Sequence, residues 1–406
     1  MNITLIKKIG GNKMLLGKMR NEKGCKTILM ILLLWFVFPF GVFAEEEDKT
    51  MESLEGIHAV SALLMDADTG RVLYEKNGYE KKAMASTTKI MTCIIALEQG
   101  NLFDTVTITA NAASQPKVRL GVQTGEQYIL EDLLYSLMLE SHNDVAVAIA
   151  EHIGGSVEGF AELMNQKARQ IGCSNTHFVT PNGLDAKGHE TTAYELGLIS
   201  RYAIQNQEFI KIINTTSHSF ANLEANRAFS VNNKDQFLNQ MEGAFGIKTG
   251  FTNQAGYCFV GALRQGDKTF ISVVLGSGWP PNKTYKWNDT NKLMKYGLQY
   301  YEKKSIYDQG KVISPVPVLD GQETMEELFY PEKELHVLLR EDEHVKVVYD
   351  LPEQLQAPIK KDMVIGSAKY YIEDVLIEEI PIYTTKDIEA IDYTFCFIKL
   401  WNMFSF

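Results

Sequence analysis

Apolar residues recur along this chain first at the spacing of strands, then at that of helices, and then again at that of strands. Residues 60–65 are almost continuously apolar and lead into a turn-forming Asp-Ala-Asp-Thr-Gly sequence, so we predict a β-hairpin over His58–Val72. Residues 90–97 are apolar on nearly all sides, and the run stops near Gly100. A helix that is apolar all round is a buried one. The pattern therefore predicts a central helix with Ser86 at its start.

Further helices and a second set of strands follow. The pattern predicts helices over 131–139 and 145–153, and a third that begins after Ser156 and ends at Gly172. The period changes to that of strands near residue 245, and the remaining predicted elements are strands at 245–250, 257–260 and 269–275 and a helix at 289–303. Strands first, helices in the middle and strands last predict an α+β domain, with helices packed on an antiparallel sheet.

The residue pattern changes again beyond this domain. Short β-rich runs at 311–313, 335–339, 344–348 and 375–377 are separated by prolines and acidic turns, which predicts a small all-β domain over 308–388.

The final segment, 391–406, carries eight large apolar residues and one charge, Lys399, in its last 14 positions. It is too short to span a bilayer. We expect an amphipathic, monotopic membrane anchor; the alternative is a last helix packed on the β-rich domain.

The first 44 residues have the pattern of an export signal. Seven basic residues precede an uncharged stretch, Thr27–Ala44, and an acidic sequence follows it. This predicts a secretory signal peptide over 1–44, cleaved after Ala44, with an uncut signal anchor as the alternative. The expected protein is extracytoplasmic, with a first folded domain over 50–307.

Charge and cysteine content exclude several classes of protein. The net charge of the 406 residues is −11, from 40 basic and 51 acidic residues; without residues 1–44, which hold seven basic and one acidic, it becomes 33 − 50 = −17. A nucleic-acid binder would need a basic face. The cysteines show no C-x-x-C pair and no zinc spacing, so we expect buried free thiols, no metal and no cofactor.

Candidate chemistry begins at Ser86-Thr87-Thr88-Lys89. Residues three apart share a helix face, so the Ser86 hydroxyl and the Lys89 amine can meet. The positive end of the helix dipole and partial burial both favour a neutral amine. A neutral Lys89 can take the Ser86 proton, which makes this a Ser-Lys nucleophile pair. A second S-x-x-K match at 114–117 contains Pro116, which would disrupt a helix.

Ser141-His142-Asn143 lies between two predicted helices. A turn there can project Ser141 and Asn143 into a cleft, where Ser141 relays a proton to a leaving amine and Asn143 holds Lys89 and a substrate amide. An isolated Ser-x-Asn is more often an ordinary helix cap, and a second match occurs at 230–232.

Lys248-Thr249-Gly250 opens a predicted edge strand. A lysine and a hydroxyl at this point can bind a carboxylate, and glycine allows the close approach of a ligand or another backbone. Addition of an extended peptide to the strand would align a substrate.

The three motifs in this order resemble the S-x-x-K, S-x-N and K-T-G signature of penicillin-binding proteins and class A β-lactamases. The chain is similar to low-molecular-weight penicillin-binding proteins, the serine-type D-alanyl-D-alanine carboxypeptidases of peptidase S11 type. The resemblance is close over 55–305, includes the sequence Thr-Pro-Asn-Gly-Leu-Asp at 180–185, and is looser over the β-rich domain and tail. His142 departs from it, because many members have glycine there.

The resemblance implies a penicillin-binding/β-lactamase-like fold and a role for each matched residue. Ser86 would attack the carbonyl of the penultimate D-alanine with Lys89 as base, and Ser141 and Asn143 would assist proton transfer. The implied substrate-binding residues are Lys248 and Thr249 for the terminal carboxylate, Gly250 beside them, and the backbone N–H groups of Ser86 and Phe251 for the oxyanion.

The implied ligands are a peptidoglycan stem peptide ending in D-Ala-D-Ala and β-lactams, which would acylate the same serine. Two alternatives stay open. A class A-like β-lactamase would need a deacylating glutamate in a loop. The sequence around Glu162 resembles such a loop, but Glu162 lies in a predicted helix. The other is a non-catalytic penicillin-binding or sensing wall protein.

Overall fold

The computed structural model describes residues 54–306, 313–329 and 335–404. The predicted signal peptide lies outside these residues.

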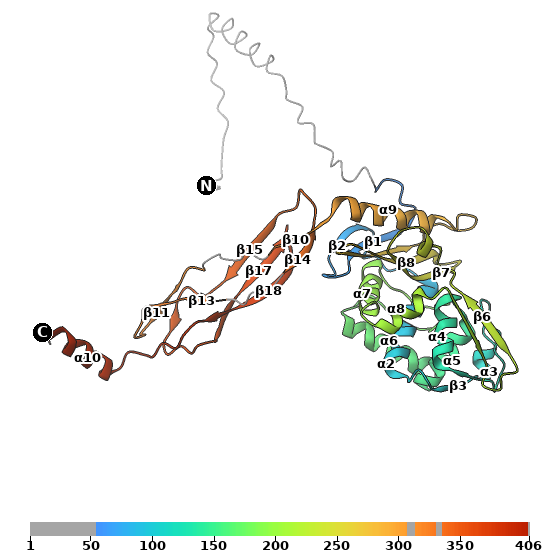
Figure 1. Ribbon diagram of the computed structural model, residues 1–406, viewed down its shortest axis with the longest axis horizontal. Coiled ribbons are helices and arrows are strands. Elements are labelled where there is room, and N and C mark those ends of the chain that lie inside the picture. Colours follow the sequence, from blue (N-terminus) through green and yellow to red (C-terminus); the bar gives the residue numbers. More distant parts are fainter. Residues whose placement is uncertain (1–53, 307–312, 330–334, 405–406) are drawn as a thin grey trace, which may run out of the picture. The chain divides into compact units, whose positions relative to one another are not determined.

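A five-stranded antiparallel sheet forms the framework of the first domain, as the sequence predicted (Figure 1). Its strands, in spatial order, are β2 (Val72–Lys76), β1 (Ser61–Asp66), β9 (Lys268–Leu275), β8 (Gly256–Gln265) and β7 (Ala244–Thr252). All six residues of β1 are buried, and their side chains alternate between two cores: Leu63 and Met65 face one, and Leu64 faces the other. The sheet is therefore covered on both faces, and β7 forms one of its edges.

Helices pack on both faces of this sheet. Figure 1 shows α9 (Tyr285–Tyr300) on one side and the main group of helices on the other. That group comprises α2 (Lys89–Gln99), α4 (Leu130–Leu139), α5 (Asn143–Gly154), α6 (Val157–Ile171), α7 (Ala193–Ala203) and α8 (Gln207–Asn214). The central helix is confirmed, because residues 89–96 of α2 are all buried. The predicted Ser156 and Gly172 caps of α6 are confirmed too.

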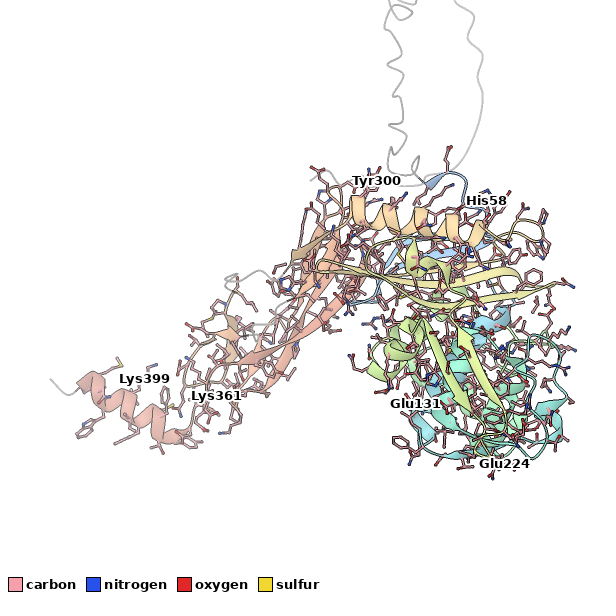
Figure 2. All side chains as sticks on the ribbon, turned by 45° about the vertical axis from the view of Figure 1, so that its right-hand side comes forward. His58, Glu131, Glu224, Tyr300, Lys361 and Lys399 are labelled. Atoms are coloured by element: carbon pink, nitrogen blue, oxygen red, sulfur yellow. The ribbon has the colours of Figure 1, made fainter. Side chains whose placement is uncertain are left out.

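A single buried carboxylate joins α9 to the sheet. Asp289 accepts hydrogen bonds from the amide of His58 at 3.0 Å, the amide of Ala59 at 2.8 Å and the hydroxyl of Ser277 at 2.6 Å. His58 and Tyr300 mark the two ends of this layer in Figure 2. The bonds fix α9 against the start of β1 and the end of β9.

Several elements differ from the sequence prediction or were missed by it. Ser86 lies in a 3₁₀ turn, η2 (Ala85–Thr88), that precedes α2 rather than inside the helix itself. The helix predicted over 289–303 runs instead over 285–300, and β10 (Glu302–Ser305) follows it. Unpredicted besides α7 and α8 are β3 (Thr105–Thr107), α3 (Ala110–Ala113), β4 (Gln127–Ile129), β5 (Ser217–Ala221), β6 (Ala228–Asn232) and η3 (Gln236–Asn239).

The β-rich prediction for the C-terminal part is confirmed. A four-stranded sheet has the order β13 (Leu328–Phe329), β18 (Val375–Thr384), β17 (Val364–Ile372) and β15 (Val345–Asp350). Beside it are a three-stranded sheet, β12 (Met325–Glu326), β11 (Val316–Leu319) and β16 (Leu355–Gln356), and the pair of β10 with β14 (His336–Leu339). Most of the run at 311–313 lies outside the described residues.

The last described element is α10 (Tyr393–Phe404), and none of its residues is buried. Phe397 stacks on Trp401, with ring centroids 6.3 Å apart, and both side chains are largely exposed. Within the described part of the chain, no helix has both the length and the apolar character needed to cross a membrane.

The cysteine prediction is confirmed for three residues: Cys93, Cys173 and Cys258 are free thiols in the core. Cys396 is also free but is exposed on α10.

Candidate active site

Ser86 and Lys89 meet at the start of the central helix. The Nζ atom of Lys89 lies 2.9 Å from the Oγ atom of Ser86, and the Lys89 side chain is fully buried. Side chains three apart eclipse one another in a 3₁₀ turn, so η2 brings the two groups together more directly than an α-helical turn. The hydroxyls of Thr87 and Thr88 hold this turn by donating to the carbonyls of Met84 and Ala85 at 2.6 and 2.8 Å.

Three oxygens surround the Lys89 amine. Besides Ser86 Oγ, these are Asn143 Oδ1 at 2.9 Å and the carbonyl oxygen of Asn182 at 2.5 Å. The two carbonyl oxygens can only accept, so each takes one N–H of the amine. In a neutral amine the remaining position is the lone pair, which then faces the Ser86 hydroxyl. The arrangement therefore directs the basic site of Lys89 toward the hydroxyl proton of Ser86.

The surroundings of Lys89 favour that neutral form. Burial lowers the pKa of Lys89 well below its usual value, the nearby charge of Lys248 lowers it further, and Asp144 opposes the shift. A buried amine without an adjacent free carboxylate loses its proton readily. Lys89 thus has the position of a general base, and its lowered pKa favours the neutral form that a base needs.

The Ser-x-Asn motif contacts the same amine through Asn143. Ser141 has a left-handed backbone, with φ of 69°, and Asn143 is the first residue of α5. Asn143 Nδ2 donates to the carbonyl of Pro116 at 3.2 Å, which leaves its Oδ1 turned to Lys89. The buried hydroxyl of Ser141 makes no hydrogen bond within the described residues. Its hydrogen-bonding capacity is therefore unused by these residues.

His142 points away from these two residues. It is 4% exposed, its Nδ1 lies 2.7 Å from the hydroxyl of Ser136, and its Nε2 lies 3.4 Å from Glu140 Oε2. Burial lowers the pKa of His142, although the charges of Asp144 and Glu140 oppose the shift. Through these contacts His142 supports the turn that carries Ser141 and Asn143.

Lys248-Thr249-Gly250 lies on β7, at the edge of the sheet and beside η2. A Cβ atom on Gly250 would lie 2.9 Å from the backbone nitrogen of Ser86. Only glycine lets the strand approach the serine so closely, which is the reason for glycine in this motif. Phe251 follows, 38% exposed, with its ring 4.6 Å from that of Tyr257.

The lysine of this motif is buried but not isolated from negative charge. Lys248 is 2% exposed, and its Nζ donates to the carbonyl of Thr249 at 3.3 Å. Burial lowers the pKa of Lys248 to about 7, with Asp235 opposing the shift and Lys286 adding to it. Lys248 is therefore poised between its charged and neutral forms at neutral pH.

The sequence analysis named residues 180–185 as part of the family resemblance but gave this loop no role in the site. Residues 180–185 present the Asn182 carbonyl, which accepts from Lys89 and, at 3.3 Å, from Ser86 Oγ. Gly183 has φ of +82°, and a Cβ there would lie 2.0 Å from the carbonyl oxygen of Ala85. At the far end, Thr252 on β7 donates to Asp185 at 2.7 Å. The available signal was Asn-Gly, a turn-forming pair, but its role depends on a backbone atom.

Two further supports were also missed. Asp144 accepts from the amides of Leu120 and Gly121 at 3.0 and 2.7 Å, which fixes the loop whose Val118 carbonyl bonds the amide of Asn143. His189 accepts at Nδ1 from the amide of Val179, so its Nε2 carries the proton and donates to Thr88 Oγ1 at 2.8 Å.

Comparison with known proteins agrees with this geometry. Residues 47–278 match the family model described as D-alanyl-D-alanine carboxypeptidase, and residues 301–390 match the C-terminal domain of penicillin-binding protein 5. The first match alone covers more than half of the chain. This chain belongs to the D-alanyl-D-alanine carboxypeptidase family. It is therefore a serine hydrolase of the penicillin-binding class.

Similar relatives cover nearly the whole chain. D-alanyl-D-alanine carboxypeptidase DacC of Escherichia coli K12 is 30% identical over 90% of this chain and 92% of its own length. DacF of Bacillus subtilis 168 is 29% identical over 89% of this chain and 94% of its own. The structure of penicillin binding protein 5 from Haemophilus influenzae has a TM-score of 0.67 at 29% identity and covers 82% of this chain and 98% of that one.

The position of Glu162 and the family matches argue against a class A-like β-lactamase. Glu162 lies on α6, is exposed to solvent, and is not among the partners of Ser86 or Lys89 within the described residues. Both family matches and the relatives instead support the carboxypeptidase.

The pKa of Lys248 predicts an alkaline limit to the use of substrates that end in a carboxylate. The ammonium is fully charged well below pH 7 and is lost as pH rises through about 7. We expect kcat/KM, which reports the free enzyme, to fall toward a slope of about tenfold per pH unit above that value. In Lys248→Arg the guanidinium stays charged, so this limit should move to higher pH. An unchanged limit in that variant would contradict the assignment.

The buried His189 predicts a loss of stability in acid. Burial lowers its pKa to about 4, against 6.5 for the free side chain, so the unfolded chain binds the extra proton first as pH falls. The stability from His189 is complete above pH 6.5 and is lost progressively toward pH 4, by about 2 kcal/mol at pH 4.5.

Urea unfolding at pH 7 and pH 4.5 measures this loss. The control is His189→Gln, because its amide can still donate to Thr88 and accept from Val179. The free energy of unfolding of this variant should fall less between the two pH values, by about the 2 kcal/mol that His189 contributes. Equal falls in both proteins would show that His189 does not titrate in this way.

Proposed function

We propose that Ser86 is the nucleophile that attacks the carbonyl of the penultimate D-alanine in a peptidoglycan pentapeptide ending in D-Ala-D-Ala. The observation that carries the proposal is the buried Lys89 amine, 2.9 Å from Ser86 Oγ, with two N–H groups directed at the oxygens of Asn143 and Asn182. Lys89 takes the hydroxyl proton as the Oγ–carbonyl bond forms. The negative charge then passes to the carbonyl oxygen.

Backbone amides stabilise that oxygen in the proposed mechanism. The donors are the N–H groups of Ser86 and Phe251. The closeness of Gly250 to the Ser86 amide supports this assignment, because it brings the next residue of β7 beside the nucleophile.

The leaving D-alanine needs a proton as the peptide bond breaks. Lys89 holds the proton taken from Ser86, and Ser141 relays it to the departing amine. The unpartnered, buried hydroxyl of Ser141 supports this role. Asn143 holds Lys89 and accommodates the substrate amide. A water molecule then attacks the ester with Lys89 again as base, which restores Ser86 and releases the shortened peptide.

The terminal carboxylate binds Lys248 and Thr249 in this scheme. β7 is an edge strand of the sheet, and the extended peptide aligns along it by strand addition in this scheme. β-Lactams acylate the same serine through their own carbonyl, and their carboxylate occupies the Lys248 position. No cofactor takes part in these steps.

Replacement of Ser86 by alanine tests the nucleophile. Ser86→Ala should abolish covalent labelling by a fluorescent penicillin and lower D-alanine release from diacetyl-Lys-D-Ala-D-Ala by about 10³-fold or more. Ser114→Ala is the matched control, because Ser114 begins the second S-x-x-K match and should leave both signals intact. Labelling that persists in Ser86→Ala would identify another nucleophile. Labelling without D-alanine release in the unaltered enzyme would favour a penicillin sensor.

The protein is proposed to work at the outer face of the cytoplasmic membrane. In this proposal residues 1–44 direct export, residues 50–307 form the catalytic domain, residues 308–388 form the β-rich domain, and residues 391–406 attach the enzyme peripherally. The exposed aromatic side chains of α10 support the last step, since such residues favour the membrane interface.

Removal of α10 tests the attachment. A chain lacking 391–406 should move from the membrane to the soluble fraction and keep its D-alanine release. Phe397→Ser/Trp401→Ser, which keeps the segment but removes the stacked aromatic pair, should also weaken binding to phosphatidylglycerol vesicles. A truncated protein that still sediments with membranes would contradict attachment through this segment.

A further inference from the structure

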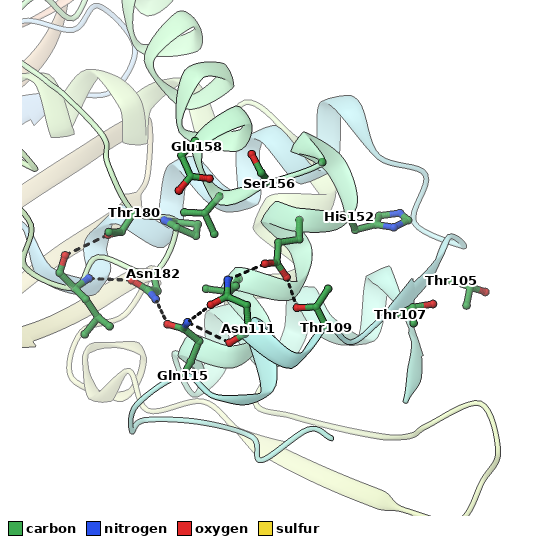
Figure 3. Close-up of a pocket in the computed structure, with 16 residues that line it drawn as sticks. Thr105, Thr107, Thr109, Asn111, Gln115, His152, Ser156, Glu158, Thr180 and Asn182 are labelled. Atoms are coloured by element: carbon green, nitrogen blue, oxygen red, sulfur yellow. Dashed lines mark hydrogen bonds between the residues drawn. The ribbon is translucent and has the colours of Figure 1, made fainter. Parts of the chain in front are cut away.

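A cavity of about 580 Å³ lies behind the loop that carries Asn182. Figure 3 shows its lining: β3 and α3 on one side, the end of α5 and the start of α6 on another, and the 180–184 loop. Ser86, Lys89 and Lys248 do not line it. None of the catalytic steps above uses this space.

The lining is polar but carries no basic residue other than His152. Half of the lining residues carry hydroxyl or amide side chains, among them Thr105, Thr107, Asn111, Gln115, Ser156 and Thr180. Side chains of a strand point alternately to its two faces. Thr105, Thr107 and Thr109 are therefore exposed, while Val106 and Ile108 between them are buried. Such a surface suits a ligand with many neutral donors and acceptors.

The charged groups in the cavity disfavour two other ligand classes. Anions are disfavoured, because Glu151 and Glu158 line it without a lysine or arginine. An ammonium group is disfavoured as well, because both oxygens of Glu151 already accept hydrogen bonds, from Thr109 Oγ1 at 2.5 Å and from Asn111 Nδ2 at 2.7 Å. Glu158 is exposed to solvent, where an ion pair contributes little.

Two cavity residues are connected to the catalytic groups. The side-chain amide of Asn182 donates to Gln115 Oε1 at 3.2 Å in the wall of the cavity (Figure 3), while its backbone carbonyl accepts from Lys89. The residue after Gln115 is Pro116, whose carbonyl accepts from Asn143 Nδ2. A ligand that bonds Gln115 and Asn182 therefore touches the two segments that position Lys89 and Asn143.

We propose that this cavity is a second binding site, for the N-acetylated amino sugars of the glycan strand that carries the stem peptide. Hydroxyl and acetamido groups match the neutral lining, and the connection through Asn182 favours acylation when the glycan is bound. This inference rests on the proposed function, because it concerns the carrier of the same substrate peptide.

Filling the cavity tests the proposal. Thr107→Trp places an indole in the cavity, and Ser219→Trp is the matched control, because Ser219 is an exposed strand residue of β5 outside the lining. The binding probe is the tetramer of N-acetylglucosamine, followed by NMR titration. The substrates are the free pentapeptide and the same pentapeptide attached to an N-acetylated disaccharide.

The expected result is a selective loss. Thr107→Trp should weaken tetrasaccharide binding and lower kcat/KM for the glycan-bearing substrate, each by about tenfold or more, and leave the free peptide and penicillin labelling unchanged. Ser219→Trp should match the unaltered enzyme in every measurement. Equal kcat/KM ratios for the two substrates in Thr107→Trp and the unaltered enzyme would overturn the proposal.

A variant with altered charge distinguishes a sugar ligand from a cationic one. Glu151→Gln should keep tetrasaccharide affinity within about threefold, since the ligand is neutral. Binding of trilysine that disappears in Glu151→Gln, without tetrasaccharide binding in the unaltered enzyme, would overturn the proposal in favour of a cationic ligand. Failure to hydrolyse the free pentapeptide would instead contradict the proposed function, whatever the sugar titration shows.

Discussion

The burial of one amine is the constraint on which the rest of the site depends. Lys89 is fully buried, and a charged ammonium there would lose its hydration at a large cost in free energy. Burial favours the neutral amine, and two oxygens from separate segments, α5 and the 180–185 loop, accept its N–H groups. The third direction has only the Ser86 hydroxyl. The same arrangement therefore satisfies the N–H groups of the buried amine and directs its lone pair at the Ser86 hydroxyl.

Bringing three segments around one amine requires unusually close backbone contacts. The Ala85 carbonyl meets Gly183, and the Ser86 amide meets Gly250, at distances that no β-carbon would allow. Ala85 itself has φ of 49°, a left-handed conformation that is costly for a residue with a side chain. The hydroxyl of Thr88, bonded to both Ala85 and His189, helps to hold that conformation. The strained turn is thus kept by neighbours outside the three motifs.

These contacts explain which parts of the site could be predicted from the sequence. Side-chain chemistry can be read from residue types, so the sequence singles out Ser86, Lys89, Asn143 and Lys248 as candidates. The period of the apolar residues predicts the sheet and its buried helix. The role of Asn182 is carried by a carbonyl that every residue possesses, so no residue type marks it.

Other misses have equally local causes. The 3₁₀ turn at Ser86 differs from an α-helix in hydrogen bonding rather than in apolar spacing, and β3 and β4 are only three residues long, too short to show a period. Asp144 and His189 are polar residues whose partners are backbone or hydroxyl groups distant in sequence, and spacing along the chain does not reveal such pairs.

The two buried lysines, Lys89 and Lys248, differ in the carboxyl groups near them. Burial lowers the pKa of both. Near Lys89 the carboxylate is Asp144, but its oxygens accept from four backbone amides, at residues 120, 121, 122 and 145, so its charge is already well compensated.

Near Lys248 the carboxyl group is Asp235. Its Oδ2 makes no hydrogen bond within the described residues, and burial raises its pKa to about 7. At neutral pH Asp235 is therefore partly protonated, and the negative charge that it does carry favours the ammonium form of Lys248. In the proposed mechanism an arriving carboxylate adds further negative charge beside Lys248 and favours its protonation. That local effect matters because the chain as a whole is acidic and would repel a carboxylate.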